Sequence, residues 1–204
     1  MPRASSTLLI ACGALAREIL ALNEANGWDA VSLTCLPAHY HNTPDKIPDA
    51  VRAKIRENRD RYDRMFVLYG DCGTGGLLDV VLAEEGVERI PGPHCYQFFA
   101  GTKEFTDMMA AEPGSFFLTD YLTRHFNRLI IEGLGLDRHP ELRDDYFGNY
   151  TALVYLAQTE DAELQGLAQD AARRLGLAYH YRFTGYGELK SFLSTATGGQ
   201  AAFA

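Results

Sequence analysis

The chain has 204 residues, of which 47% are hydrophobic and 23% are charged, and its formal net charge is -8. These proportions are ordinary for a globular protein and allow a sizeable core. The length suits one α/β domain better than two. The acidic balance argues against a nucleic-acid or anionic-membrane surface, because such surfaces need clustered lysine and arginine. No apolar run approaches the ~20 residues of a membrane span.

The N-terminal segment has two interpretations. Residues 9–12, Leu-Ile-Ala-Cys, look like a bacterial lipoprotein cleavage box. The apolar stretch before the cysteine is shorter than the roughly 7–15 residues of a signal-peptide core, so we prefer a buried first strand and a cytoplasmic location. In that compartment the four cysteines are expected to be reduced, and therefore buried, metal-bound or catalytic.

Apolar segments rich in strand-forming residues alternate with segments of helical spacing. Strands are predicted at residues 7–11, 30–36, 65–69, 87–90, 115–118, 152–156 and 177–181. Helices are predicted at residues 15–26, 49–58, 77–82, 96–101, 104–111, 120–132, 161–175 and from 188 onward. This alternation predicts a doubly wound, mostly parallel sheet of about five or six strands flanked by helices, of Rossmann or flavodoxin type. We expect a single α/β domain over residues 1–204, with a disordered tail at 195–204.

The four cysteines occupy equivalent places in this layout. Cys12 and Cys35 end the first two predicted strands, Cys72 lies in the turn after the third, and Cys95 follows the fourth. Because parallel strands end at one edge of a sheet, we expect the four thiols along that edge, where open α/β sheets bind ligands. Cys12, Cys72 and Cys95 also lie near helix starts, where the positive helix end favours the thiolate.

Thiolates and imidazoles at one edge point to a soft or borderline metal such as zinc. His41 lies in the loop after the second strand. No close pair such as C-x-x-C is present, and ligands from separate loops are more typical of an active site than of structural zinc. The alternative is that the cysteines are small, buried hydrophobic residues. We favour that alternative for Cys35, and a functional role for Cys72 and Cys95.

The glycine-rich segment 70–76 offers a different interpretation. Its backbone, at Gly70, Gly73 and Gly75, could cradle the phosphate of a nucleotide or other phosphorylated ligand. The segment lacks the Gly-Lys-Ser/Thr ending of a P-loop, and its glycines do not have G-x-G-x-x-G spacing. We therefore keep phosphate binding as the minor hypothesis.

Three further side chains near the same edge are candidates for proton transfer. His94 precedes Cys95, and adjacent residues usually point in different directions, so we do not assign both to one ion. Asp71 is a candidate acid or base that could equally shape the turn. Asp120 is another candidate, although it also suits the N-cap of a helix.

Several segments of the chain, in the same order, resemble the domain-of-unknown-function family numbered 1638. They are L-I-A-C-G-A-L at residues 9–15 with Glu18 and Ile19, H-N-T-P at 41–44, Y-G-D-C-G at 69–73, I-P-G-P-H-C at 90–95 with Gly101, and G-S-F-F-L-T at 114–119. The resemblance covers most of the chain. It implies that Cys12, His41, Cys72 and Cys95 correspond to the family's cysteines and histidine.

The resemblance also carries an expectation about metabolism. Family members are often associated with corrinoid-dependent demethylation of methylamines or betaines, which implies methyl-transfer metabolism and a corrinoid protein or methyltransferase as a partner. The sequence departs from the family pattern in two places. His94 stands where members often have Asp, and Thr43 stands where they often have Arg.

The leading hypothesis is an enzyme that acts on a small-molecule substrate. A zinc ion held by Cys12, Cys72, Cys95 and His41 would activate a thiol, amine or water for methyl transfer or hydrolysis. His94 or Asp71 would then move protons. Three alternatives stay open: a [4Fe–4S] cluster on three cysteines, a non-catalytic accessory protein of a corrinoid methyltransferase, and a metal-free protein that binds a phosphorylated ligand.

Overall fold

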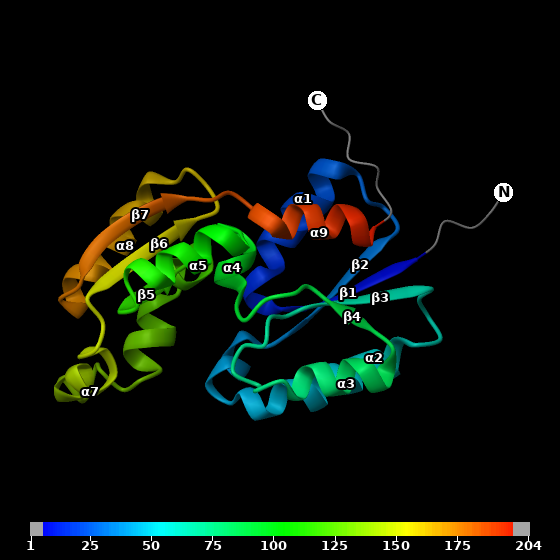
Figure 1. Ribbon diagram of the computed structural model, residues 1–204, viewed down its shortest axis with the longest axis horizontal. Coiled ribbons are helices and arrows are strands. Elements are labelled where there is room, and N and C mark those ends of the chain that lie inside the picture. The colour runs from blue at the N-terminus through cyan, green and yellow to red at the C-terminus, as the bar shows by residue number, and fades with distance from the viewer. Residues whose placement is uncertain (1–5, 198–204) are drawn as a thin grey trace. The chain divides into compact units, whose positions relative to one another are not determined.

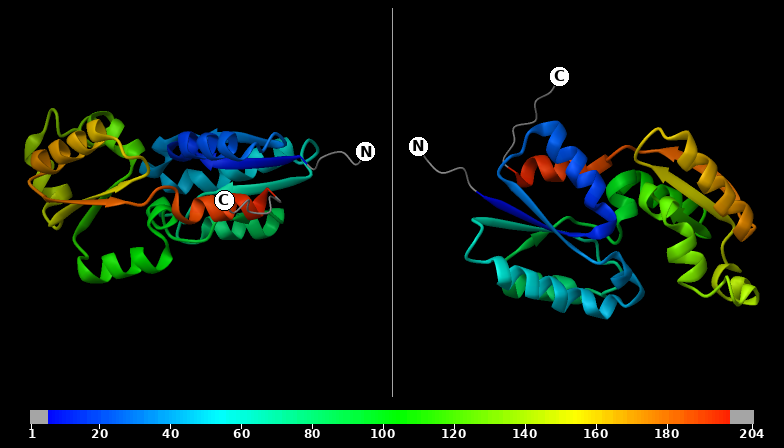
Figure 2. Two further views of the ribbon diagram at one scale, coloured as in Figure 1. Left: turned by 90° about the horizontal axis from the view of Figure 1, so that it is seen from above. Right: turned by 180° about the vertical axis from the view of Figure 1, so that it is seen from behind.

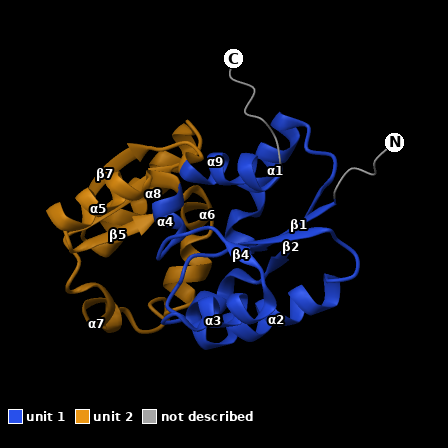
Figure 3. Cartoon of the chain, turned by 45° about the vertical axis from the view of Figure 1, so that its right-hand side comes forward, with its two compact units in different colours: residues 1–98, 188–204 blue, residues 99–187 orange. Residues whose placement is uncertain are grey.

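The computed structural model describes residues 6–197. Within that range the chain forms two compact units, which Figure 3 colours separately. The described part of unit 1 comprises residues 6–98 and 188–197, and unit 2 comprises residues 99–187. Each unit contains its own parallel sheet with helices. The α/β class predicted from the sequence is therefore confirmed, whereas the single domain stays a prediction, because two compact units can belong to one domain.

Unit 1 contains a four-stranded parallel sheet. Its strands are β1 (Thr7–Cys12), β2 (Val31–Leu36), β3 (Arg64–Leu68) and β4 (Glu88–Arg89), in the order β2-β1-β3-β4. All six residues of the central strand β1 are buried, as expected for a parallel strand covered on both faces. The register pairs Cys12 with Leu36 and Ala11 with Leu68, so β1, β2 and β3 end at the same edge.

Helices cover both faces of this sheet, with α1 and α9 on one side and α2 and α3 on the other (Figures 1 and 2). The helical segments of unit 1 are η1 (Gly13–Leu15), α1 (Ala16–Asn26), η2 (Ala38–Asn42), η3 (Pro44–Lys46), α2 (Ile47–Asn58), α3 (Leu77–Glu85) and most of α4 (Cys95–Ala100) and α9 (Gly187–Ala196). Of the predicted tail at 195–204, residues 195 and 196 belong to α9, and residues 198–204 lie outside the described residues.

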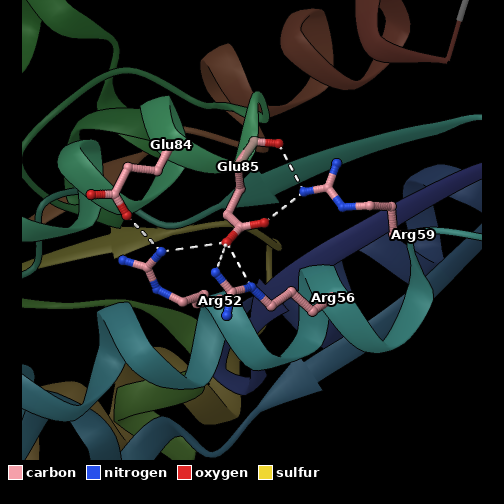
Figure 4. A network of polar contacts seen from close by, with 5 residues as sticks. All are labelled: Arg52, Arg56, Arg59, Glu84 and Glu85. Atoms are coloured by element: carbon pink, nitrogen blue, oxygen red, sulfur yellow. Dashed lines mark hydrogen bonds and ion pairs between the residues drawn. The ribbon is translucent and has the colours of Figure 1, made fainter.

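An ion-pair network joins α2 to α3 (Figure 4). Arg52 and Arg56 on α2, and Arg59 at its C-cap, face the end of α3. Arg52 lies 2.6 Å from Glu84, and Glu85 accepts hydrogen bonds from Arg56 at 2.8 Å and Arg59 at 2.6 Å. These hydrogen bonds, that of Arg56 first, lower the pKa of Glu85. Arg59 also donates to the backbone carbonyl of Glu85, where the negative end of α3 favours a cation.

Unit 2 contains a three-stranded parallel sheet in the order β5-β6-β7. Its strands are β5 (Ser115–Leu118), β6 (Ala152–Ala157) and β7 (Ala178–Phe183). Its helical segments are α5 (Thr102–Ala111), α6 (Asp120–Arg124), the π-helical η4 (Asn127–Glu132), η5 (Pro140–Leu142), α7 (Arg143–Phe147) and α8 (Ala162–Leu175). The central strand β6 is buried along its whole length, whereas the edge strand β7 is largely exposed.

The predicted single sheet of about five or six strands was wrong, because the strands divide between two sheets. β4 has only two residues, and it pairs with β3 through Glu88 and Arg89 alone. The segment Pro91-Gly92-Pro93 follows almost at once, and proline has no backbone N–H to donate to a further strand. β4 therefore ends the first sheet, and among the described strands β5 pairs with β6 alone.

A buried carboxylate joins the ends of β5 and β6. Asp120 accepts hydrogen bonds from the Tyr155 hydroxyl at 2.7 Å, the backbone amide of Gln158 at 3.0 Å and the Thr159 hydroxyl at 2.6 Å. The predicted N-cap role of Asp120 was wrong, because Thr119 is the N-cap of α6. Asp120 is the first helical residue, and its side chain points to β6 rather than to its own helix.

No described helix combines the length and the apolar character needed to cross a membrane.

Candidate functional site

The loops at the carboxyl edge of the unit 1 sheet carry the predicted site residues. Cys12 ends β1 and is buried, Cys72 is buried in the loop after β3, and Cys95 is half-buried at the start of α4. His41 lies in η2, after β2. Cys35, which we expected to be a buried core residue, is exposed. That expectation was wrong because β2 is an edge strand of the sheet.

Two glycines allow these loops to approach one another closely. A Cβ on Gly70 would lie 2.8 Å from both the carbonyl oxygen of Pro93 and the amide nitrogen of His94, a distance that real Cβ atoms essentially never show. A Cβ on Gly13 would lie 3.2 Å from the carbonyl oxygen of Leu36. The loop after β3 therefore packs backbone to backbone against the loop after β4, and the loop after β1 against the end of β2.

Backbone hydrogen bonds fix the loop that carries Cys72 to the loop that precedes Cys95. The Cys72 amide donates to the carbonyl of Pro93 at 2.8 Å, and the Asp71 amide donates to that of Gly92 at 3.1 Å. Cys72 has a φ of 50°, and no other non-glycine residue in the described range 6–197 has a positive φ. Such a conformation costs on the order of 1–3 kcal/mol, and residues that adopt it cluster at functional sites.

The Asp71 carboxylate shapes the turn before α3. It accepts hydrogen bonds from the Thr74 hydroxyl at 2.8 Å and from the amides of Gly75 at 3.2 Å and Gly76 at 2.8 Å. These bonds, that of Gly76 first, lower the pKa of Asp71, which makes it a weak base. They also occupy two of the amides that a bound phosphate would use. Phosphate binding by this loop, and a catalytic role for Asp71, stay predictions.

His41 is held in a single neutral tautomer. Its Nδ1 lies 2.9 Å from the carbonyl oxygen of Ala38, which can only accept, so Nδ1 carries the proton and Nε2 keeps a lone pair. Burial lowers the pKa of His41 and keeps the ring neutral. The same Nδ1 lies 3.8 Å from the Cys12 sulfur, and the ring stacks on Tyr69 with centroids 6.2 Å apart. Metal-binding histidines commonly donate their other ring N–H to a backbone carbonyl in this way.

The three inner thiols are protonated at neutral pH. Burial raises the pKa of Cys12 to about 11 and that of Cys72 to about 12. Burial also raises the pKa of Cys95 well above its usual range, and ionisation of Cys72 or Cys12 would raise it further. The prediction that helix starts favour the thiolates was wrong, because desolvation of the charged form outweighs the helix end. Cys12 and Cys72 also pack in one buried cluster.

The donor chemistry of this cluster fits zinc, which binds mixed thiolate and imidazole sets. Over residues 6–197, no three His, Cys, Asp or Glu side chains already stand in a metal-binding group. A bound ion would therefore have to replace the thiol protons and draw the sulfurs together. Zinc and the [4Fe–4S] cluster both stay predictions.

Two buried polar side chains at this edge, Tyr69 and Glu18, belong to the family-like segments of the sequence but were not predicted to have a role in the site. Tyr69 is 1% exposed and packs in the same buried cluster as Cys12 and Cys72. Its hydroxyl lowers the pKa of the Cys12 thiol but has no partner in hydrogen-bond geometry. Leaving a buried hydroxyl unpaired costs about 1–3 kcal/mol. Glu18, in the first turn of α1, is also buried, and its charge contributes to the raised pKa of Cys95. The only local signal was a tyrosine between a buried strand and a glycine turn.

Together, the fold and the site define an α/β protein with buried thiols gathered at the carboxyl edge of a parallel sheet. A family model described as "Protein of unknown function (DUF1638)" matches residues 35–193. This match spans more than half of the chain, so the chain belongs to that family, as its sequence motifs indicated. The matched range includes His41, Cys72 and Cys95, whereas Cys12 precedes it. No curated protein and no solved structure matches the chain.

Proposed function

We propose that this protein is an enzyme with a zinc site formed by Cys12, Cys72, Cys95 and His41. The observation that carries the proposal is that three cysteines from three separate loops lie at the carboxyl edge of the sheet, where open α/β sheets bind ligands. Cys12 and Cys72 share one buried cluster, and the Cys12 sulfur lies 3.8 Å from Nδ1 of His41. A backbone hydrogen bond from Cys72 to Pro93 holds the third loop, which leads to Cys95, against the second. Such a set of soft donors, beside an imidazole with a free Nε2, is suited to zinc.

The loop geometry argues against ordinary core packing. A buried cysteine that only fills space needs neither a strained backbone nor a close backbone approach. Cys72 has both, because its φ is positive and Gly70 allows the neighbouring loop to come within contact distance. Strain of this kind persists only when the surrounding structure enforces it.

The proposed chemistry is the activation of a nucleophile on a small-molecule substrate. Bound zinc would keep a thiol, amine or water deprotonated at neutral pH. Burial lowers the pKa of His94, so its neutral imidazole is able to take up the proton that the nucleophile releases. In methyl transfer, the nucleophile forms a bond to the methyl carbon while the bond to the leaving group breaks, and the leaving group keeps that electron pair. In hydrolysis, the nucleophile is water.

Methyl transfer is the reaction that we favour, with a corrinoid protein or a corrinoid methyltransferase as the partner. The support for this choice is the association of the family with corrinoid-dependent demethylation. The residues of the chain itself support a site that binds a metal and activates a nucleophile, but they do not identify the substrate.

The test is elemental analysis with a visible spectrum on protein purified without oxygen and without a histidine tag. We expect about one equivalent of zinc and no colour. Replacing Cys72 by Ser should remove most of the metal, whereas Cys35→Ser, which changes an exposed thiol near the same edge, should retain it. If the protein instead contains iron and shows broad visible absorbance, the site holds an iron–sulfur cluster rather than zinc. Metal-free wild-type protein, or full metal retention by the Cys72 variant, would contradict the proposal.

A further inference from the structure

We propose that Tyr69 is a positioning residue of this site, whose hydroxyl donates a hydrogen bond to the Cys12 sulfur when that sulfur is a metal-bound thiolate. This inference rests on the proposed metal site. It adds a neutral side chain that is not among the predicted metal ligands or proton-transfer residues.

The strand register brings Tyr69 to Cys12. Ala11 on β1 pairs with Leu68 on β3 in the parallel sheet. Cys12 and Tyr69 each follow directly after this pair, so they lie side by side at the carboxyl ends of two neighbouring strands. Both are buried in one cluster, which also contains Cys72. The His41 ring stacks on the Tyr69 ring with an interplanar angle of 17°, which fixes the phenol from the side of the second loop.

The Tyr69 hydroxyl is buried and makes no hydrogen bond of good geometry in the metal-free protein, although the Cys12 sulfur is close enough to interact with it electrostatically. A neutral thiol is a weak acceptor, whereas a thiolate accepts strongly because it is charged. Loss of the Cys12 proton to a metal would therefore create the acceptor that this hydroxyl lacks.

Unit 2 offers a matched control. Tyr155, within the central strand β6 of the unit 2 sheet, is also fully buried, but its hydroxyl donates to Asp120 at 2.7 Å. Replacing either tyrosine by phenylalanine removes one oxygen and keeps the ring. The two substitutions are expected to change different properties: Tyr155→Phe should lower the stability of the metal-free protein, and Tyr69→Phe should weaken zinc binding. Tyr155→Phe breaks a formed hydrogen bond, whereas Tyr69→Phe removes a hydroxyl that has no partner until metal binds.

The experiment compares wild type, Tyr69→Phe and Tyr155→Phe in the full chain. Three quantities are measured: the Tm of the metal-free protein, the zinc Kd by competition with a chromophoric chelator at neutral pH, and the sulfur-to-metal charge-transfer band of the cobalt(II) form. For Tyr69→Phe we expect an unchanged or higher Tm, a zinc Kd about tenfold weaker and a shifted band. For Tyr155→Phe we expect a lower Tm, with an unchanged Kd and band.

Two results would overturn the role of Tyr69 alone. One is a Tyr69→Phe variant that matches wild type in zinc Kd and cobalt band. The other is a metal-free Tm that falls as it does in Tyr155→Phe, since that would make the hydroxyl a structural one. Wild-type protein that binds neither zinc nor cobalt would overturn the proposed function and this inference together, and it is recognised before any variant is compared.

Discussion

The carboxyl edges of the two sheets use polar side chains in opposite ways. In unit 2, the Asp120 carboxylate accepts three hydrogen bonds and joins β5 to β6. In unit 1, Cys12 and Cys72 are buried as protonated thiols, and the Tyr69 hydroxyl beside them has no partner. A buried polar group whose bonding capacity is used stabilises a fold, whereas one whose capacity is unused is available to a ligand.

The largest effect that this comparison predicts is the pH dependence of metal binding. Because the pKa values of Cys12, Cys72 and Cys95 are all raised, each thiol must lose a proton to bind zinc. Zinc affinity should therefore rise with pH in the range below these pKa values, by up to about a thousandfold per pH unit for three released protons. Chelator competition at several pH values, in buffers that do not bind zinc, measures this slope. A flat profile would show that the thiols are not the ligands.

The next largest effect is expected in unit 2. Asp120→Ala leaves the hydroxyls of Tyr155 and Thr159 and the Gln158 amide without their acceptor, and should lower the free energy of unfolding by about 3 kcal/mol. Urea unfolding measures the loss. The exposed Asp145, on α7, provides the control, since Asp145→Ala should change stability by less than about 0.5 kcal/mol. If the two substitutions lowered stability equally, the hydrogen bonds of Asp120 would not be what stabilises unit 2.

A smaller effect should come from the backbone contact that gathers the thiol loops. Gly70→Ala places a Cβ 2.8 Å from backbone atoms of Pro93 and His94, so the two loops must separate. We expect a loss of about 2 kcal/mol in stability, as for other overpacked sites, and a weaker zinc site. Gly166→Ala is the control, because a Cβ there, within α8, meets nothing within 4 Å and should stabilise the helix by about 1 kcal/mol. Unchanged zinc binding in Gly70→Ala would show that this contact does not position the thiols.

Several features of the fold could be predicted because they depend on local sequence. Hydrophobic runs identified all seven strands that the structure describes over residues 6–197, including β1 and the fully buried β6. The position of Cys12, Cys72 and Cys95 at strand ends followed from those runs. The division into two sheets could not be predicted in the same way, because a two-residue strand such as β4 has no distinctive pattern and its pairing decides where the sheet ends.

The candidate site was predicted less completely than the strands that carry it. The residue types and their loops could be read from the sequence, but the burial of each side chain could not. Cys35 is exposed because its strand lies at the sheet edge, and the Cys12 thiol is protonated because desolvation outweighs the helix end. The unpaired hydroxyl of Tyr69 also depends on contacts between separate loops, which no local pattern records.

The sequence by itself determined the α/β class, the strands and the family to which the chain belongs, because hydrophobic periodicity, turn glycines and short motifs are properties of neighbouring residues. Only the tertiary structure decided which strands pair, which thiols are buried together and which polar groups keep a partner. The physical reason is that pairing, desolvation and hydrogen-bond satisfaction arise from residues distant in the chain. Cys12 and Tyr69, 57 positions apart in number, become neighbours only through the pairing of β1 with β3.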